Sequence, residues 1–545
     1  MRRAAGLGAA AVALLAALLS LGALALPASA GAQELKSVPD LDTKPALFQR
    51  TGREIAKIAA TNEEVREEVA DHPGATRDVY TKGTGRWQVS WFAKTKPGEP
   101  RVEIAQVLVD DRTGGILEAW TDYKVAWTMA RGYDGAFGRK VNAPYVWIPL
   151  LIAFLVPFVD WRRPFQLLHL DLLVLGGFSA SLAFFNAAEV DVSVPLVFPL
   201  LAYLLFRMLA VGLKRAPRPA PRVWISPSYL LIGIVFLVGF RIGLNLTSSN
   251  VIDVGYAGVI GADRIGHGEA IYGNFPDDNQ HGDTYGPLNY LLYLPFELLF
   301  PWTGAWNDLP AAHAAAIVFD LLTMAGLYAL GRRAAGHAVG VAVTYAWAAF
   351  PFTLFVLNCN ANDALVSALL VGTLLVASSA PARGVFAGLA AMAKLAPAAL
   401  VPLLATHGME GATLADRARK LVLFALPFTA AVVALLALVV DDLRTFWDVT
   451  VAFQADRNAP FSVWGLYDLD LLQKLMQAAA VILAVALAVV PRRHDLAGLA
   501  ALCAAVLIAL QLSVTYWFYL YIVWFFPLVM LALLAPRPLL RRSTA

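Results

Sequence analysis

The residues of this chain whose types suit chemistry lie in two polar loops and in one hydrophobic segment. The first loop, residues 247–285, has one basic residue, Arg264, and six acidic residues: Asp253, Asp263, Glu269, Asp277, Asp278 and Asp283. The second loop, residues 441–469, contains Arg457 and Trp464, and Lys394 interrupts the hydrophobic segment 384–405. A positioned carboxylate can take a proton from a hydroxyl group, and Lys and Arg can bind phosphate. These residues therefore suit general-base chemistry beside an anionic group.

The composition places these loops in a membrane protein. The chain has 545 residues, of which 59% are hydrophobic and 15% are charged, and its mean hydropathy is +0.61. Soluble domains average about 45–50% apolar and about 25% charged residues. This difference excludes an ordinary cytosolic enzyme, a disordered chain and a nucleic-acid binder. The two cysteines, Cys359 and Cys503, cannot form a disulfide framework.

The N-terminus is typical of a secretory signal peptide over residues 1–30. Arg2 and Arg3 precede an apolar run that reaches Leu26, and the small residues up to Ala30 suit cleavage after that position. An uncleaved first membrane span is the alternative. Either interpretation places the following residues outside the cytoplasm.

Residues 31–135 form the one extended polar region, and we expect a small α+β domain there. Apolar residues at helical spacing predict one helix, with Ile55, Ile58, Ala59, Val65 and Val69 on one face. Alternating patterns predict strands over residues 87–91, 102–109 and 116–120, with a hairpin turn at 110–115. A helix, a small antiparallel sheet and a V-D-x-x-T-G-x-I-type turn together resemble PepSY-like extracytoplasmic modules. The resemblance implies a binding or regulatory role.

From Pro144 onward the sequence predicts an all-α polytopic membrane protein. Hydrophobic spans are expected at 144–161, 165–187, 193–213, 226–246, 311–330, 338–357, 363–380, 418–440, 470–490, 496–513 and 516–535. Cytoplasmic loops collect Lys and Arg, and the basic clusters share one side if segment 286–301 does not cross and segment 384–405 crosses twice. The chain then has about 13 crossings, with three accessory helices over residues 136–225 and a core over residues 226–545.

Both ambiguous segments have features that agree with this solution. Segment 286–301 would reach about 24 Å as a helix, short of a hydrocarbon core of about 30 Å, and contains three prolines, so we expect an interfacial or re-entrant helix. Segment 384–405 would place Lys394 in lipid, and a break near Lys394–Pro397 would bring the ammonium to the outer surface. Arg241 and Asp320 also lie inside predicted spans, where a functional role and a structural ion pair both remain open.

The order of motifs in the core resembles the GT-C superfamily of integral-membrane glycosyltransferases, which use polyprenyl-phosphate sugars. A span leads into an outer loop that begins with Val251–Tyr256 and ends in Tyr285-Gly286-Pro287-Leu288, before the interfacial helix. The next span closes with Leu327–Arg333, as in the protein-mannosyltransferase and lipid-A aminoarabinose-transferase branches. Residues Gly388–Pro397 are similar to the G-L-x-x-x-x-K-x-x-P hairpin of this superfamily.

The resemblance implies inverting transfer of a sugar, such as the hexose mannose, from a polyprenyl-phosphate donor to a glycolipid, polysaccharide or protein acceptor. It implies Asp253 as the catalytic base, and Asp263 in the same loop is the second choice. Lys394 is a candidate ligand of the donor phosphate, with a lysine that anchors a helix end as the alternative. Arg457 is a second candidate for the phosphate or the sugar, with a solvated charge at the rim as the alternative. Tyr285 and Trp464 are the aromatic residues that we single out for substrate binding. No cofactor is expected; a divalent cation at Asp277, Asp278, His281 and Asp283 is the alternative that the sequence leaves open.

The expected location is the plasma membrane, with a multi-pass chain and with both the N-terminal module and the active site extracytoplasmic. Two other function classes remain. A transporter or flippase of lipid-linked saccharides would need a polar path through the bilayer and often shows internal repeats, which this sequence lacks. A non-catalytic membrane-anchored sensor would need one span of about 20 residues, far fewer than the chain contains.

Overall fold

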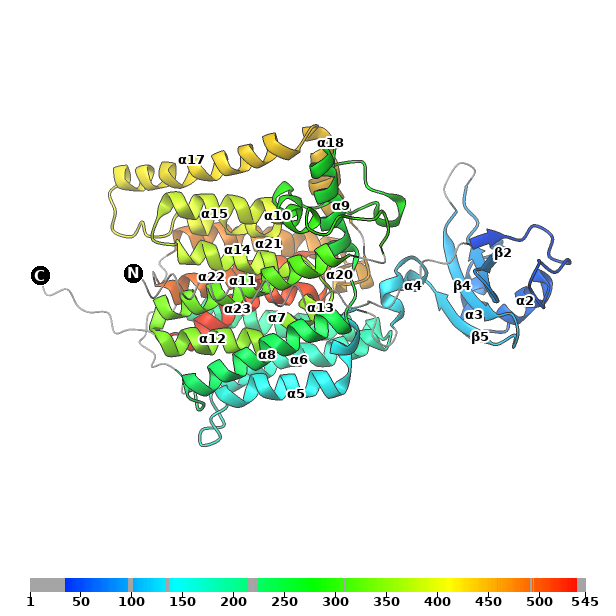
Figure 1. The fold of residues 1–545 in the computed structure, drawn as a ribbon, viewed down its shortest axis with the longest axis horizontal. Helices are drawn as coiled ribbons and strands as arrows, with labels where there is room; N and C mark the ends of the chain where they lie inside the picture. Colours follow the sequence, from blue (N-terminus) through cyan, green and yellow to red (C-terminus); the bar gives the residue numbers. More distant parts are fainter. Residues whose placement is uncertain are drawn as a thin grey trace, which may run out of the picture. The chain divides into compact units, whose positions relative to one another are not determined.

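The structure is a computed structural model. It describes residues 35–536 apart from 97–100, 133–136, 214–220, 222, 307–308, 458, 491–492 and 494. The predicted signal peptide, residues 1–30, lies outside the described residues. The chain forms two compact units, a sheet unit of Ser29–Ala136 with Ala183–Val192 and a helical unit of Phe137–Leu182 with Ser193–Ala545. Figure 1 shows the elements of both units.

The sheet unit contains a five-stranded antiparallel sheet whose strands are neighbours in sequence order. The elements are β1 (Leu35–Ser37), α2 (Gly52–Ala59), α3 (Glu63–Asp71), β2 (Thr76–Lys82), β3 (Arg86–Phe92), β4 (Glu103–Asp110), β5 (Ile116–Thr121) and α4 (Tyr123–Ala126). The three predicted strands correspond to β3, β4 and β5. Ile55, Ala59 and Val65 pack with Trp87 and Val107 in one hydrophobic core, so the predicted helical face is the buried face.

One predicted helix is two helices in the structure. The side chain of Asn62 accepts a hydrogen bond from the Val65 backbone N–H, and Asn62 is therefore the N-cap of α3. Ala60 is the C-cap of α2, so the helix breaks between α2 and α3. The helical spacing of apolar residues continues across this break, and periodicity alone therefore does not reveal it. The PepSY-like resemblance stays a prediction.

The hairpin turn of this unit uses its acidic residues structurally. The carboxylate of Asp111 accepts hydrogen bonds from the backbone N–H groups of Gln49 and Arg50, at 2.7 Å and 3.1 Å, and from the Trp87 indole at 2.8 Å. Asp110 accepts from the backbone and hydroxyl of Thr113, both at 2.7 Å. The Asp110 contacts provide hydrogen bonds within the turn, and the Asp111 contacts connect the turn to the segment before α2.

The rest of the described chain is almost entirely helical. Its α-helices are α5 (Pro144–Leu155), α6 (Leu167–Asn186), α7 (Val190–Leu213), α8 (Pro227–Thr247), α9 (Asp253–His267), α10 (Pro287–Glu297), α11 (Pro310–Ala335), α12 (His337–Ala349), α13 (Pro351–Asn358), α14 (Asp363–Leu375), α15 (Ala380–Ala393), α16 (Val401–Ala405), α17 (Leu414–Val439), α18 (Leu443–Trp447), α19 (Phe453–Asp456), α20 (Val463–Leu466), α21 (Asp470–Val489), α22 (Leu496–Ser513) and α23 (Ile522–Leu534).

Seven of the described helices are long and apolar enough to cross a membrane, or eight if the bent pair α12 and α13 is one span. Other predicted spans are shorter helices, such as α14 and α5. Thirteen crossings therefore stay a prediction. The span predicted at 338–357 is bent by 57° where α12 ends and Pro351 begins α13, because proline cannot donate the backbone hydrogen bond that would continue the helix.

Both ambiguous segments have the expected local structure. Segment 286–301 contains the 11-residue helix α10, which is not among the candidate spans. Segment 384–405 is broken: α15 ends at Ala393, Lys394 is extended, and a 3-10 turn leads into α16.

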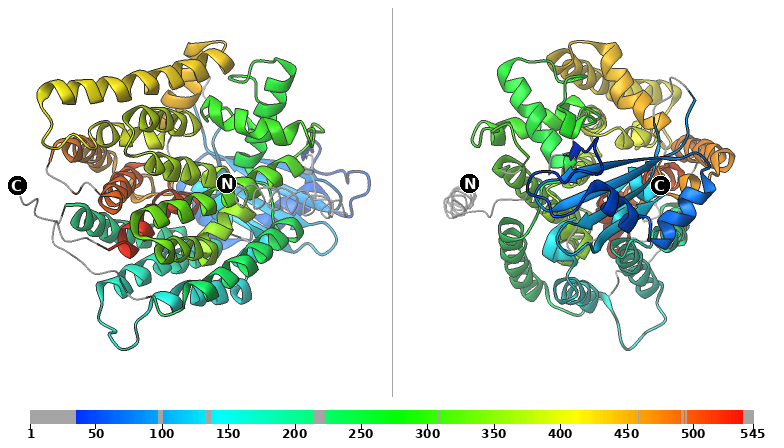
Figure 2. Two further views of the ribbon diagram at one scale, coloured as in Figure 1. Left: turned by 60° about the vertical axis from the view of Figure 1, so that its left-hand side comes forward. Right: turned by 90° about the vertical axis from the view of Figure 1, so that its right-hand side faces the viewer.

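The helical unit has an enclosed centre and an exposed periphery. Within its most apolar window α22 is 89% buried, whereas α17 and α21 are 11% buried in theirs. Figure 2 shows α17 along the edge of this unit. Aromatic packing fills the centre, as in the stacked rings of Phe350 and Phe526, whose centroids are 4.1 Å apart. Exposed apolar faces on peripheral helices are what lipid contact requires.

Four charged residues inside the described spans form two ion pairs. Arg241 of α8 pairs with Asp320 of α11 at 2.5 Å, and the Trp347 indole donates to the same carboxylate at 2.8 Å. Arg207 pairs similarly with Asp171 at 2.8 Å. The sequence left open whether Arg241 and Asp320 have a functional role or form a structural ion pair. Their contact in the structure is that of an ion pair between α8 and α11.

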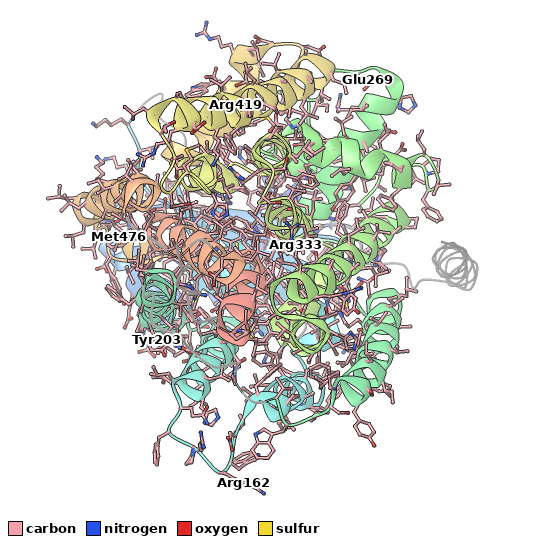
Figure 3. All side chains as sticks on the ribbon, turned by 90° about the vertical axis from the view of Figure 1, so that its left-hand side faces the viewer. Arg162, Tyr203, Glu269, Arg333, Arg419 and Met476 are labelled. Carbon is pink, nitrogen blue, oxygen red and sulfur yellow. The ribbon has the colours of Figure 1, made fainter. Side chains whose placement is uncertain are left out.

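The two ends of the helical unit differ. Figure 1 shows α9 and α18 at one end and the start of α17 at the other. Figure 3 looks onto the second end, where Arg162, Arg333 and Arg419 are labelled; all three are exposed.

Candidate active site

Asp253 is the first residue of α9, directly after the segment that follows the α8 span. Its side chain is exposed, whereas the next nine residues of the helix, Val254–Ala262, are buried. The Asn279 amide donates to the Asp253 carbonyl oxygen at 3.0 Å. The structure thus presents one accessible carboxylate at the start of an otherwise buried helix.

The segment before Asp253 is held by the asparagine-rich residues 358–362. The backbone N–H groups of Asn250 and Ile252 donate to the carbonyl oxygens of Asn358 and Cys359, both at 3.1 Å. The Asn360 amide donates to the Asn250 carbonyl at 3.0 Å. A Cβ atom on Gly255 would lie 2.3 Å from the Asn360 carbonyl oxygen, so glycine permits the close approach that sets the start of α9.

Lys394 lies at the break that ends α15. Gly286 packs against this end so closely that a Cβ atom on it would lie 2.0 Å from the Met392 carbonyl oxygen. The neighbouring Tyr285 ring lies 5.4 Å from the Lys394 ammonium, and the rings of Trp524 and Tyr521 lie 5.2 Å and 5.8 Å from it. The loop end that contains Tyr285 therefore contacts the break after α15.

Asp363 is a site residue to which the sequence analysis gave no role. Its side chain is fully buried at the start of α14, and it accepts from the Lys394 ammonium at 2.6 Å and from the Trp524 indole at 2.8 Å. Its other carboxylate oxygen has no hydrogen-bond partner among the described residues. The only sequence signal was its place at the end of the polar run 358–363, because its partners lie 31 and 161 residues away.

Arg457 directly follows α19. Its guanidinium lies 3.5 Å from the centroid of the Tyr516 ring, and its carbonyl oxygen accepts from the Thr515 hydroxyl at 2.8 Å. The helical turns before it, η6 (Asp448–Ala452), are a π-helix, a form that often occurs at functional sites. Stacking and the backbone contact both hold Arg457 against the connection between α22 and α23.

Asp253 interacts electrostatically with both Arg457 and Lys394. The surrounding protein desolvates the carboxylate and raises the pKa of Asp253, whereas its backbone hydrogen bond, Arg457 and Lys394 act to lower it. An exposed group is normally well hydrated, but the protein around Asp253 removes water from its carboxylate. Asp253 is exposed, and its carboxylate is still partly desolvated by neighbouring protein. Asp253, Lys394, Arg457 and, through Lys394, Tyr285 are thus brought together.

Asp263 and Trp464 are not part of this group. Asp263 is ten residues further along α9, about 15 Å at 1.5 Å per residue, and its side chain lies 3.4 Å from His267. The Trp464 indole is buried, donates to the Leu512 carbonyl at 2.8 Å and packs edge-on against Phe198. Trp464 thus has contacts typical of a packing residue.

The acidic residues considered for a cation have other contacts. Asp283 accepts from the Gly273 backbone at 2.7 Å, Asp278 accepts from the Tyr256 hydroxyl at 3.3 Å, and His281 stacks on Phe453. Within the described ranges, no group of three or more His, Cys, Asp or Glu side chains is arranged to hold a metal ion.

Comparison with known families finds a matching family model. Residues 284–515 match the model of glycosyltransferase family 87. The matched region contains Tyr285, Asp363, Lys394 and Arg457 and begins after Asp253. No curated protein matches the chain. The match indicates a glycosyltransferase, and together with the apolar helices it supports a multi-pass membrane glycosyltransferase.

Proposed function

We propose that this protein transfers a sugar, a hexose such as mannose, from a polyprenyl-phosphate donor to an extracytoplasmic acceptor by inversion, with Asp253 as the base. The observation that carries the proposal is the accessible carboxylate of Asp253 beside two cations, in a chain that matches a glycosyltransferase family. A lipid-linked donor fits a helical unit whose site elements adjoin apolar helices.

The chemistry assigns a role to each charge. The acceptor hydroxyl oxygen attacks the anomeric carbon, its proton passes to Asp253, and the bond between that carbon and the phosphate oxygen breaks. Polyprenyl phosphate leaves with an additional negative charge, which a nearby cation stabilises. Arg457 and Lys394 are the cations that act on Asp253. Tyr285, at the edge of the same group, can contact the sugar.

The test is transfer by the purified full-length protein. It is incubated with polyprenyl-phosphate mannose, glucose or arabinose, each radiolabelled in the sugar, and with a membrane extract that supplies acceptors. We expect label to move from one donor into an acceptor, and Asp253→Asn to abolish the transfer without loss of the folded protein. Donor that moves between vesicle leaflets without any transfer would instead indicate a transporter.

A further inference from the structure

The two cations of the candidate active site have different surroundings. The Lys394 side chain is 11% exposed, and its ammonium donates to Asp363, a carboxylate with no exposed surface. The remaining directions face the rings of Tyr285, Tyr521 and Trp524. Lys394 is therefore enclosed by one carboxylate and three aromatic rings, and its charge is compensated within the protein.

Arg457 is held in a different way. The central carbon of its guanidinium lies 3.5 Å from the centroid of the Tyr516 ring. The in-plane N–H groups of an arginine are those that bind phosphate in a bidentate manner.

The buried Asp363 carboxylate depends on Lys394 to compensate its negative charge. One carboxylate oxygen accepts both of the hydrogen bonds, from Lys394 and Trp524, and the other has no partner among the described residues. A buried carboxylate that lost the ammonium would keep one indole N–H and would be strongly destabilised. Movement of Lys394 to a bound phosphate would therefore leave Asp363 uncompensated.

We propose that Asp363 is a positioning residue that holds Lys394 inside the aromatic enclosure, so that Arg457 and not Lys394 binds the donor phosphate. The inference rests on the proposed function, which supplies the phosphate. Lys394 then acts through its fixed position, by shaping the wall beside Tyr285 and the field at Asp253. Lys394 and Asp363 form a neutral pair, and Arg457 is the other cation near Asp253 that can contact the donor phosphodiester.

The test measures binding and turnover separately. Full-length protein in nanodiscs of zwitterionic lipid is titrated with radiolabelled polyprenyl phosphate, and with polyprenol as the control that lacks the phosphate. The variants are Arg457→Gln, Lys394→Met, Asp363→Asn and the double variant Asp363→Asn/Lys394→Met. The double variant removes both charges together, so it keeps the experiment informative if Lys394→Met alone does not fold.

We expect Arg457→Gln to weaken binding of polyprenyl phosphate at least tenfold. Lys394→Met, or the double variant, should change this affinity less than threefold while lowering kcat at least tenfold. Asp363→Asn should retain or increase the affinity, because it releases Lys394, and should also lower kcat. A purely structural role for Asp363 would reduce the amount of folded protein and would not separate kcat from affinity.

The opposite pattern would overturn the inference alone. If folded Lys394→Met or the double variant loses at least tenfold in affinity, Lys394 is the phosphate ligand. If Arg457→Gln binds polyprenyl phosphate normally, Arg457 is not the phosphate ligand. If wild-type protein binds polyprenyl phosphate no better than polyprenol, the proposed donor class is wrong and the inference fails with it.

Discussion

Asp253 differs from the other acidic residues of its loop in its surroundings. Asp263 is paired with His267, Asp278 accepts from Tyr256 and Asp283 from the Gly273 backbone. Asp253 is exposed and lies within the electrostatic influence of two cations. A general base must be accessible to its substrate, and Asp253 combines exposure with two nearby cations.

Asp253→Asn should lower sugar transfer by about 10² to 10⁴-fold, the usual contribution of a general base. The amide has nearly the same size but cannot take the proton. The measurement is the initial rate of label transfer by purified protein. Asp263→Asn on the same helix is the matched control and should retain most of the activity; equal losses in both variants would remove the distinction between the two residues.

The pH dependence should report the desolvation of Asp253. The reaction requires the ionised carboxylate, and desolvation raises the pKa of this group. Activity is therefore present above the raised pKa and is lost as the pH falls through it. We expect kcat/KM to decline at a pH clearly above about 4, the ordinary pKa of aspartate. A rate that stays constant down to pH 4 would argue against Asp253 as the base.

At the scale of elements, the site depends on interruptions of helices. Asp253 begins α9, Lys394 occupies the break after α15, and Arg457 follows α19. Each interruption brings a polar side chain to a point where a continuous helix would present apolar surface. The asparagine-rich connection between α13 and α14 holds the segment before α9 and ends in Asp363.

Gly286→Ala should disturb this arrangement. The backbone at Gly286 has an ordinary φ of −70°, so alanine adds no backbone strain and its effect comes from the Cβ atom, 2.0 Å from the Met392 carbonyl. Overpacking of this kind costs about 1–3 kcal/mol. We expect a lower thermal midpoint and at least a tenfold loss of transfer, because Tyr285 and Lys394 must move apart.

Gly243→Ala is the control for Gly286→Ala. Gly243 lies in α8, and a Cβ atom there would have no neighbour within 4 Å. This variant should match wild-type protein in both thermal midpoint and transfer. If Gly286→Ala were equally silent, the close contact between the loop end and α15 would not be needed for function.

Local features of the sequence predicted the elements that carry the site. A lysine in the middle of an apolar segment indicated the break at Lys394, and the short proline-containing segment 286–301 indicated a helix that does not cross. The polar strand β2 and the break at Asn62 lacked such a local signal. Asp363 was missed because its role follows from contacts with Lys394 and Trp524, far away in the chain, which residue spacing cannot reveal.

At the scale of the whole molecule, sidedness decides whether the proposed reaction has a place to occur. The exposed residues Arg162, Arg333 and Arg419 lie after α5, in the last turn of α11 and near the start of α17. In Figure 1, α17 begins at the end of the helical unit opposite α9 and α18. Positively charged loops remain in the cytoplasm. The loop with Asp253 should therefore face the exterior, where a lipid-linked donor and an envelope acceptor can meet.

Cysteine labelling of intact cells tests this orientation. Both native cysteines are buried, so they should react little with a membrane-impermeant maleimide. Glu269→Cys replaces a side chain that is 60% exposed and should be labelled in intact cells, whereas Arg419→Cys should be labelled only after permeabilisation, because α17 begins at the opposite end. The reverse pattern would place Asp253 on the cytoplasmic side and would contradict extracytoplasmic transfer, even if the purified protein were active.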